Sequence, residues 1–316
     1  MKSVVKNLRH NLFNGMQYFF SVRYTDHFNE LMKLRPLKPI LAKYLCFAGM
    51  VMSLGFFGCS GKMNKKMARV ISTATNADNT LTVQEKGEGW ELLFNGTNFD
   101  GWRILGHDDA QSVLWEIEEG IVHKVNSGEV PSLADGQPLN GGDLMTIKKY
   151  DDFELYFEWK ILKAGNTGLK YNVSEELSQK YSKHSAIGFE YQLLDDGDTL
   201  YAGKLKCSQF TGSLYDLIPA NNARPKPVGE FNTSRIIIDG NHVSHWLNGE
   251  RVVEYVFGSK QLDSVYKLSK YKDYLQFLDK RSGHIVLQNH KDDAWFKNIK
   301  IRELNKAENL KPKHQE

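Results

Sequence analysis

Residues 153–160 read Phe-Glu-Leu-Tyr-Phe-Glu-Trp-Lys, and the spacing of their side chains is the clearest indication of fold class in the chain. Large apolar side chains stand at every second position: Phe153, Leu155, Phe157 and Trp159. Because successive side chains of a β-strand point to opposite faces of its sheet, this period of two predicts a strand with one buried and one wet face. Such strands are typical of antiparallel sheets that contact water on one side.

The same pattern recurs on both sides of this strand, between Trp90 and Leu304. Asp239-Gly240 and Asn248-Gly249 favour type I′ turns, so they predict two consecutive hairpins over residues 235–257. Further short strands are expected at residues 115–125, 167–172, 188–194, 212–217, 284–288 and 295–303. Helices do not alternate with these strands, so the sequence predicts an all-β fold, an antiparallel β-sandwich of roughly a dozen strands.

One stretch departs from the period of two. Within residues 260–280, the apolar side chains recur near helical intervals: Leu262, Val265, Tyr266, Tyr274, Phe277 and Leu278. This spacing predicts one short helix lying across a rim of the sandwich.

Composition narrows the classes of function. The chain has 316 residues, with 41 Lys and Arg against 38 Asp and Glu and a formal net charge of +3. Residues 1–58 hold eight basic and two acidic residues, so residues 59–316 carry a net charge of −3. We therefore expect no nucleic-acid partner. Three cysteines are too few for a disulfide framework.

The N-terminal region has the pattern of an export signal. Tyr44 to Gly58 is an uncharged, mostly apolar run that follows four basic residues. It is too short for a membrane span, which needs ~20 residues, and suits a signal peptide. Gly58-Cys59 resembles a bacterial lipoprotein processing site, so we expect a signal peptide over 32–58 and lipidation of Cys59. An uncleaved anchor helix is the alternative.

The remaining boundaries follow from this signal. A signal peptide begins a protein, so we expect translation to start at Met32 and residues 1–31 to be outside the protein; a long leader is the alternative. Residues 59–89 are rich in Lys, Thr, Asn and Ser and read as a flexible tether, 90–304 form the sandwich, and 305–316 are a tail. The expected location is outside the cytoplasm, anchored by lipid to the outer membrane or its periplasmic face.

Polar side chains on the wet faces of the predicted strands form a candidate site. The residues are Glu158, Asn166, Lys170, Glu190, Gln192 and Gln288, with His245 in the second hairpin. If their strands are neighbours, these groups form a concave polar patch that suits a sugar, whose hydroxyls need paired donors and acceptors. The alternative is an outer face solvated by cross-strand ion pairs.

A series of short motifs, in order along residues 90–304, resembles the 3-keto-disaccharide hydrolase domain family. The motifs are Trp90-Glu-Leu-Leu-Phe-Asn-Gly96, Asp100-Gly101-Trp102, Trp115-Glu-Ile-Glu-Glu-Gly120, Asp152-Phe-Glu-Leu-Tyr-Phe-Glu-Trp159, Gly165-Asn-Thr-Gly168, Gly188-Phe-Glu-Tyr-Gln192, Gly212-Ser-Leu-Tyr215, His245-Trp-Leu-Asn-Gly249 and Gly283-His-Ile-Val-Leu-Gln288. The resemblance implies a concanavalin-like jelly roll that acts on 3-keto-glycosides. The chain departs from the family pattern at Lys170, where Arg is usual, and at Asn289, where Asp is common.

The implied chemistry makes definite demands on the site. A ketone at C3 of a sugar acidifies the hydrogen on C2, a general base removes that proton, and the enolate expels the aglycone from C1. Water addition then gives net hydrolysis. Such a site needs a base, a cation or metal near the enolate oxygen, and an acid for the leaving group.

Candidate residues can be named for these roles. Glu158 and Glu190, expected on neighbouring faces, are the candidate carboxylates, and Lys170 is the candidate cation. A divalent metal held by Glu158, Glu190 or His290 is the alternative to Lys170. Substrate hydroxyls would be bound by Asn166, Gln192, Tyr215 and Gln288, with His245 as a proton carrier.

Two other functions remain open from sequence. An ordinary retaining glycosidase on this fold would carry a compact Glu-x-Asp-x-x-Glu strand, which the chain lacks. A non-catalytic sugar-binding lipoprotein would have aromatic side chains dominating the patch and its carboxylates engaged in structural pairs.

Overall fold

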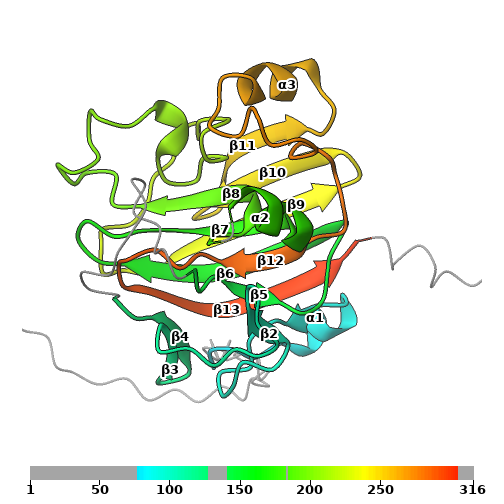
Figure 1. Ribbon diagram of the computed structural model, residues 1–316. Helices are drawn as coiled ribbons and strands as arrows, with labels where there is room; N and C mark the ends of the chain where they lie inside the picture. Colours follow the sequence, from blue (N-terminus) through cyan, green and yellow to red (C-terminus); the bar gives the residue numbers. More distant parts are fainter. Residues whose placement is uncertain (1–76, 127–140, 183, 305–316) are drawn as a thin grey trace, which may run out of the picture. The chain divides into compact units, whose positions relative to one another are not determined.

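The computed structural model of the chain describes residues 77–126, 141–182 and 184–304 (Figure 1). The predicted start at Met32, the signal peptide, the lipidation site Cys59, the first part of the tether and the tail lie outside the described residues.

Two antiparallel sheets form the body, which confirms the predicted sandwich (Figure 1). Sheet A has eight strands: β11 (Glu250–Val256), β10 (His242–Leu247), β9 (Asn232–Asp239), β6 (Phe153–Ile161), β13 (Ala294–Glu303), β4 (Ile121–Lys124) and β3 (Trp115–Glu118) in spatial order, with β1 (Glu91–Leu92) beside β13. Sheet B has five strands in the order β2 (Trp102–Ile104), β5 (Leu144–Thr146), β12 (His284–Leu287), β7 (Asn166–Ser174) and β8 (Ile187–Leu194).

The core lies between the two sheets. The alternating apolar residues of β6 point into it, and Phe157 and Trp159 are at most 1% exposed. Phe157 meets Tyr191 of β8 edge to face, with ring centroids 5.7 Å apart, so the two sheets interlock through aromatic packing. The polar alternate residues of each strand therefore lie on the outer faces.

One predicted hairpin turn is confirmed, whereas a second turn and one predicted strand need correction. The confirmed β10–β11 turn places Asn248 (φ 49°) and Gly249 (φ 90°) at its centre, as a type I′ turn requires. In the β9–β10 turn the central residues are Gly240 and Asn241, one residue later than predicted. Residues 212–217 form turns and isolated bridges rather than a strand, because Gly212 (φ 81°) and Asp216 (φ 58°) interrupt the extended backbone.

The helix predicted within 260–280 is present as α3 (Lys260–Tyr266), capped by Ser259. The prediction of one helix is incomplete, because the described residues contain two further short α-helices. These are α2 (Glu175–Tyr181), which is capped by Ser174, and α1 (Val83–Gly87), which is capped by Thr82. Among the described residues, no helix is long and apolar enough to span a bilayer.

The second half of the predicted tether belongs to the body. Glu85 of α1 pairs with Lys300 of β13, and the Asn79 amide donates to Asn298 Oδ1 at 2.6 Å. Residues 78–89, predicted as part of the tether, therefore pack against the sandwich.

His245 lies in the core between the sheets, so its predicted place among substrate-binding residues is wrong. Its side chain is fully buried, with Nε2 2.7 Å from the Tyr171 hydroxyl and Nδ1 3.0 Å from the Gly212 carbonyl. Burial lowers its pKa from 6.5 to about 4. β10 alternates regularly, and His245 lies on the same inner face as Val243 and Leu247, so the alternation itself places this imidazole in the core.

This buried imidazole should make stability pH-dependent. The unfolded chain binds a proton below pH 6.5 and the folded chain only near pH 4, so His245 lowers stability progressively as pH falls through that interval. Between pH 7.5 and pH 4, the free energy of unfolding should fall by about 3 kcal/mol more in the wild type than in His245→Gln. Urea unfolding at both pH values measures this, and equal pH dependence in the two proteins would contradict it.

Candidate functional site

The polar side chains of β7 and β8 lie together on the outer face of sheet B. β7 is hydrogen-bonded to β12 on one side and β8 on the other. Across the β7–β8 pair, Lys170 stands opposite Glu190 and Gly168 opposite Gln192. Three of the strands expected to be neighbours, β12, β7 and β8, therefore lie side by side, and the Gln288 backbone amide continues the pairing by donating to the Gly168 carbonyl at 2.9 Å.

A small hollow, open to solvent and with an accessible volume of about 20 Å³, lies on this face. Its lining residues are Asn166, Glu190, Gln192, Tyr215, Lys270, Gln288 and His290. Five of the seven are residues that the sequence analysis assigned to catalysis or to hydroxyl binding, and His290 was a metal candidate. Lys270 was not predicted, because it lies in a turn segment after α3 that carries no strand periodicity.

The Glu190 carboxylate lies directly over Gly168. A Cβ atom at position 168 would stand 2.4 Å from Glu190 Oε1 and 2.8 Å from its Cγ. Any other residue would have to push this side chain aside, so the glycine in the middle of β7 allows the close approach. The carboxylate is thereby placed between β8 and β12, at the centre of the hollow.

Glu190 is 4% exposed, yet its carboxylate forms no hydrogen bond or ion pair with any described residue. Other buried carboxylates are held by partners: Glu154 by Arg235 at 2.9 Å and Arg302 at 2.6 Å, and Asp216 by Lys206 at 2.9 Å. Buried charges are normally paired, so an unengaged carboxylate in a polar hollow is typical of a functional group.

Amide groups border this carboxylate. Gln192 Nε2 donates to Asn166 Oδ1 at 3.1 Å, whereas the buried Gln192 Oε1 has no hydrogen-bond partner. Asn166 Nδ2 lies 3.5 Å from His290 Nε2. A buried acceptor without a partner costs free energy, and a ligand hydroxyl would satisfy it.

Tyr215 and Lys270 form the opposite rim. Lys270 Nζ lies 4.6 Å from the centroid of the Tyr215 ring, and the Lys270 backbone amide donates to Asp216 Oδ2 at 2.7 Å. The loop that carries Tyr215 and the turn that carries Lys270 are therefore joined beside the hollow.

Lys170 does not line the hollow. Its Nζ donates to Ser185 Oγ at 2.8 Å and to the Ala186 carbonyl at 3.1 Å. The same atom lies 3.6 Å from Asp143 Oδ2. At 3% exposed, this ammonium is compensated by a buried counter-charge. Sequence analysis could not detect this, because Asp143 is on a distant segment.

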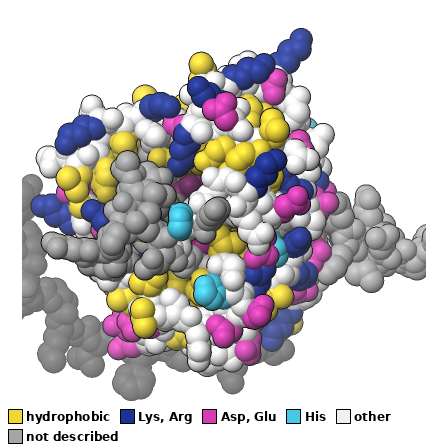
Figure 2. All heavy atoms as spheres, viewed as in Figure 1, with side chains coloured by type: hydrophobic (Ala, Val, Ile, Leu, Met, Phe, Trp, Pro, Cys, Tyr) yellow, Lys and Arg dark blue, Asp and Glu magenta, His cyan; other side chains and the backbone are white. Residues whose placement is uncertain are grey.

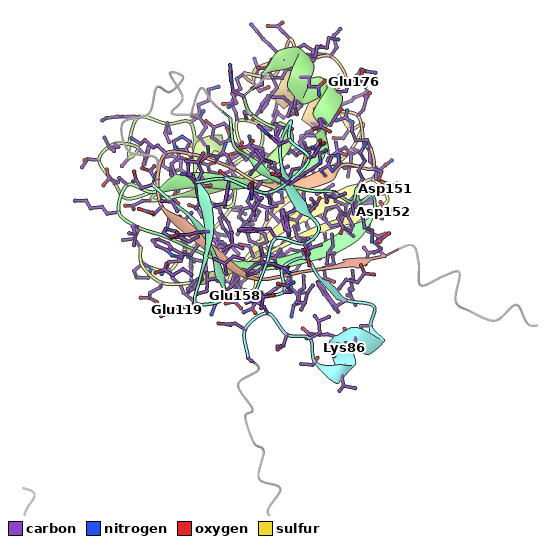
Figure 3. All side chains as sticks on the ribbon, turned by 60° about the horizontal axis from the view of Figure 1, so that its bottom comes forward. Lys86, Glu119, Asp151, Asp152, Glu158 and Glu176 are labelled. Atoms are coloured by element: carbon purple, nitrogen blue, oxygen red, sulfur yellow. The ribbon has the colours of Figure 1, made fainter. Side chains whose placement is uncertain are left out.

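The expectation that Glu158 shares a site with Glu190 is wrong. Glu158 is on β6 of sheet A, where it accepts hydrogen bonds from Tyr156 Oη at 2.9 Å and Asn298 Nδ2 at 3.0 Å. In Figure 3 it lies near Glu119, far from Glu176 on α2, the helix that follows β7. Alternation shows which residues face outward but not to which sheet a strand belongs.

The three residues predicted as possible metal ligands do not lie together, because they belong to two different sheets. Glu190 and His290 line the hollow, whereas Glu158 is on the outer face of the other sheet. Within the described ranges, no group of three or more His, Cys, Asp or Glu side chains is placed to hold a metal ion.

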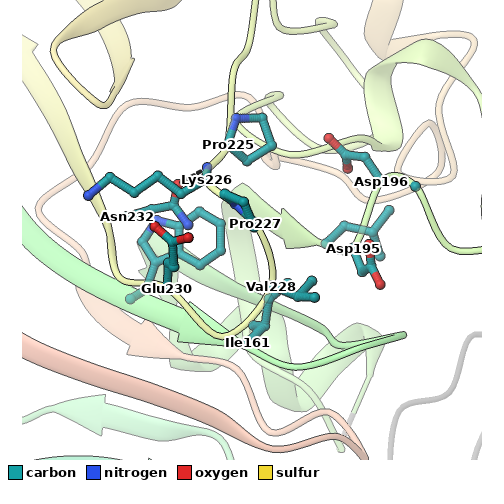
Figure 4. Close-up of a pocket in the computed structure, with 12 residues that line it drawn as sticks. Ile161, Asp195, Asp196, Pro225, Lys226, Pro227, Val228, Glu230 and Asn232 are labelled. Carbon is teal, nitrogen blue, oxygen red and sulfur yellow. Dashed lines mark hydrogen bonds between the residues drawn. The ribbon is translucent and has the colours of Figure 1, made fainter. Parts of the chain in front are cut away.

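A second cavity lies at one end of the sandwich and is bordered by Trp159, Asp195, Asp196 and Lys226 (Figure 4). Asp195 accepts a hydrogen bond from the Ala164 amide at 2.9 Å, and Asp196 from the Thr211 amide at 2.9 Å. The carboxylates of Asp195 and Asp196 are therefore engaged in holding loops. On the surface shown in Figure 2, charged side chains of both signs are interspersed.

Together, the sandwich and its amide-lined hollow with one unengaged carboxylate define a candidate carbohydrate-active protein. Residues 89–302 match the family described as the 3-keto-alpha-glucoside-1,2-lyase-like domain, and the chain belongs to this family.

Relatives of known name agree with this assignment. A 3-keto-disaccharide hydrolase from Bacteroides thetaiotaomicron is 33% identical over 243 residues, covering 71% of this chain and 82% of its own. A crystal structure titled as a glycosyl hydrolase from Parabacteroides distasonis is 30% identical, with a TM-score of 0.62, over 72% of this chain and all of its own. A second structure from that organism, 23% identical with a TM-score of 0.50, shares the fold over 68% of this chain and 99% of its own.

The environment of Lys170 predicts a structural role that can be measured. Lys170→Met would leave Asp143 buried without its counter-charge, so the free energy of unfolding should fall by about 3–5 kcal/mol. The control Lys163→Met removes an exposed lysine and should change it by less than about 0.5 kcal/mol. Unaltered stability of Lys170→Met in urea unfolding would contradict this role.

Proposed function

We propose that the protein cleaves the glycosidic bond of 3-keto-glycosides, with Glu190 as the general base that removes the C2 proton. The observation that carries the proposal is the buried, unengaged Glu190 carboxylate in a hollow lined by amides. Membership of a family described as 3-keto-alpha-glucoside-1,2-lyase-like and similarity to a 3-keto-disaccharide hydrolase identify the substrate class.

Glu190 then has one chemical task in the first step. Its carboxylate takes the proton from C2, the electron pair forms an enolate with the C3 ketone, and the enolate expels the aglycone from C1 as the ketone re-forms. The product is an enone with a double bond between C1 and C2. Addition of water, with hydroxide to C1 and a proton to C2, completes hydrolysis; without it the reaction is an elimination.

The surrounding side chains would hold the sugar for this step. Gln192 Oε1 is a buried acceptor without a partner, and Asn166, Gln288 and Tyr215 add donors and acceptors around it. Fixing the ring by several hydrogen bonds holds the C2 hydrogen within reach of the base, which is a major source of rate enhancement.

An ordinary retaining glycosidase fits the hollow less well. That mechanism needs two carboxylates about 5 Å apart across the scissile bond. Among the described residues that line the hollow, Glu190 is the sole carboxylate.

The proposal predicts a specific pair of variants. The full chain should release aglycone from a 3-keto-β-glucoside and not from the unoxidised glucoside. Glu190→Gln should lower kcat by roughly 10²–10⁴-fold, the range that general-base catalysis contributes. The matched control Glu158→Gln changes a carboxylate on the other sheet and should stay within about threefold of wild type.

Two results would overturn the assignment. Release of aglycone from both glucosides would indicate an ordinary glycosidase. Binding of the keto-glucoside without release would indicate a sugar-binding lipoprotein.

We propose further that the protein is exported and anchored by a lipid on Cys59. The proposal is supported by the basic and apolar segments that precede Gly58-Cys59. When the full chain is produced in a bacterial host with labelled palmitate, the wild type should carry label in the membrane fraction. Cys59→Ala should carry none, whereas the control Cys46→Ala, within the apolar run, should be labelled like wild type. Equal labelling of Cys59→Ala would refute the anchor.

A further inference from the structure

The proposed elimination leaves one demand unmet, because the oxygen that departs from C1 must receive a proton. Glu190 cannot supply it, since it is occupied in taking the proton from C2. A glycosidic oxygen of an alcohol or sugar is a poor leaving group, so proton donation by a second side chain lowers the barrier to C1–O cleavage.

His290 is placed to supply this proton. It lines the hollow and is 4% exposed. Nε2 is on the side of Asn166, whose Nδ2 is 3.5 Å away, and Nδ1 is 3.6 Å from Asp292 Oδ2. In the imidazolium form both nitrogens carry protons, so one can face the carboxylate while the other faces the hollow.

Asp292 lies beside His290 at ion-pair distance. Its Oδ2 is buried and accepts no hydrogen bond within the described ranges, while it lies beside the imidazole. A carboxylate beside an imidazole favours one orientation of the ring. The adjacent Asp293 is engaged elsewhere, with His123 Nε2 at 2.9 Å and the Asn126 amide at 2.9 Å.

Glu190 and His290 reach the hollow from different strands of sheet B. Glu190 is on β8 and His290 follows β12, with β7 between these strands. Neighbouring strands lie about 4.8 Å apart, so the two backbones are separated by roughly 10 Å.

We infer that His290 is the general acid of the reaction and that Asp292 is its positioning residue; this inference rests on the proposed function. The C1–O bond breaks as the His290 imidazolium transfers a ring proton to the departing oxygen, which leaves a neutral imidazole. In the hydration step this imidazole takes a proton from water as hydroxide adds to C1. Glu190 returns its proton to C2, so both groups recover their starting states.

Leaving-group dependence tests this role directly. The experiment compares the 3-keto-glucosides of methanol and of 4-nitrophenol, which share the sugar but differ in how much the departing oxygen needs a proton. His290→Gln should lower kcat/KM for the methyl glycoside at least about 100-fold and for the nitrophenyl glycoside less than about tenfold. Asp292→Asn should show the same selective loss by a smaller factor. The matched control Asp293→Asn should affect both substrates equally.

The possible results distinguish a failure of the His290 assignment from a failure of the proposed function. If wild type cleaves both keto-glycosides but His290→Gln and Asp292→Asn lower both rates equally, or not at all, His290 is not the acid and the proposed function stands. If wild type cleaves neither, the proposed function itself fails. Selective loss in Asp292→Asn alone, should His290→Gln not fold, still supports the inference.

Discussion

The pairing of β7 with β8 is the constraint on which the site depends. Its register sets Lys170 opposite Glu190 and Gly168 opposite Gln192, so that the carboxylate can lie over a residue without a side chain. A slip of one residue would turn Glu190 into the core. The core prevents such a slip, because Tyr191, the inward neighbour of Glu190, donates to the Trp246 carbonyl and accepts from Ser234 Oγ.

Around this strand pair, one buried carboxylate joins the segments that frame the hollow. Asp143 accepts hydrogen bonds from the Ala186 and Asn289 amides, each at 2.7 Å, and offsets the charge of Lys170. It thus ties the start of β8 to the loop that carries His290. A buried network of this kind is costly when incomplete and rigid when satisfied, which suits a scaffold for catalysis. The two buried acids of this region therefore differ: Asp143 is held by structural contacts, whereas the Glu190 carboxylate forms no hydrogen bond or ion pair with a described residue.

Much of this architecture was predictable from local pattern. Period-two alternation was enough to place Glu190 and Gln192 on one outer face and to indicate a sandwich, because burial of one face imposes that spacing. Local pattern contains no information on which sheet a strand joins, so Glu158 was grouped with the wrong neighbours. Nor could it detect that Asp143 neutralises Lys170 or that a turn brings Lys270 to the rim. These errors all concern contacts between distant segments.

The account depends most on removal of a proton from C2, and deuterium incorporation measures this directly. The protein is incubated with a 3-keto-glucoside in D₂O, and the released sugar is analysed by NMR at C2. Elimination followed by water addition predicts a sugar that carries deuterium at C2, because the proton taken by Glu190 exchanges with solvent before it is returned. A released sugar that retains its original C2 hydrogen throughout would contradict the account, since the bond at C1 would then have been broken without an enolate.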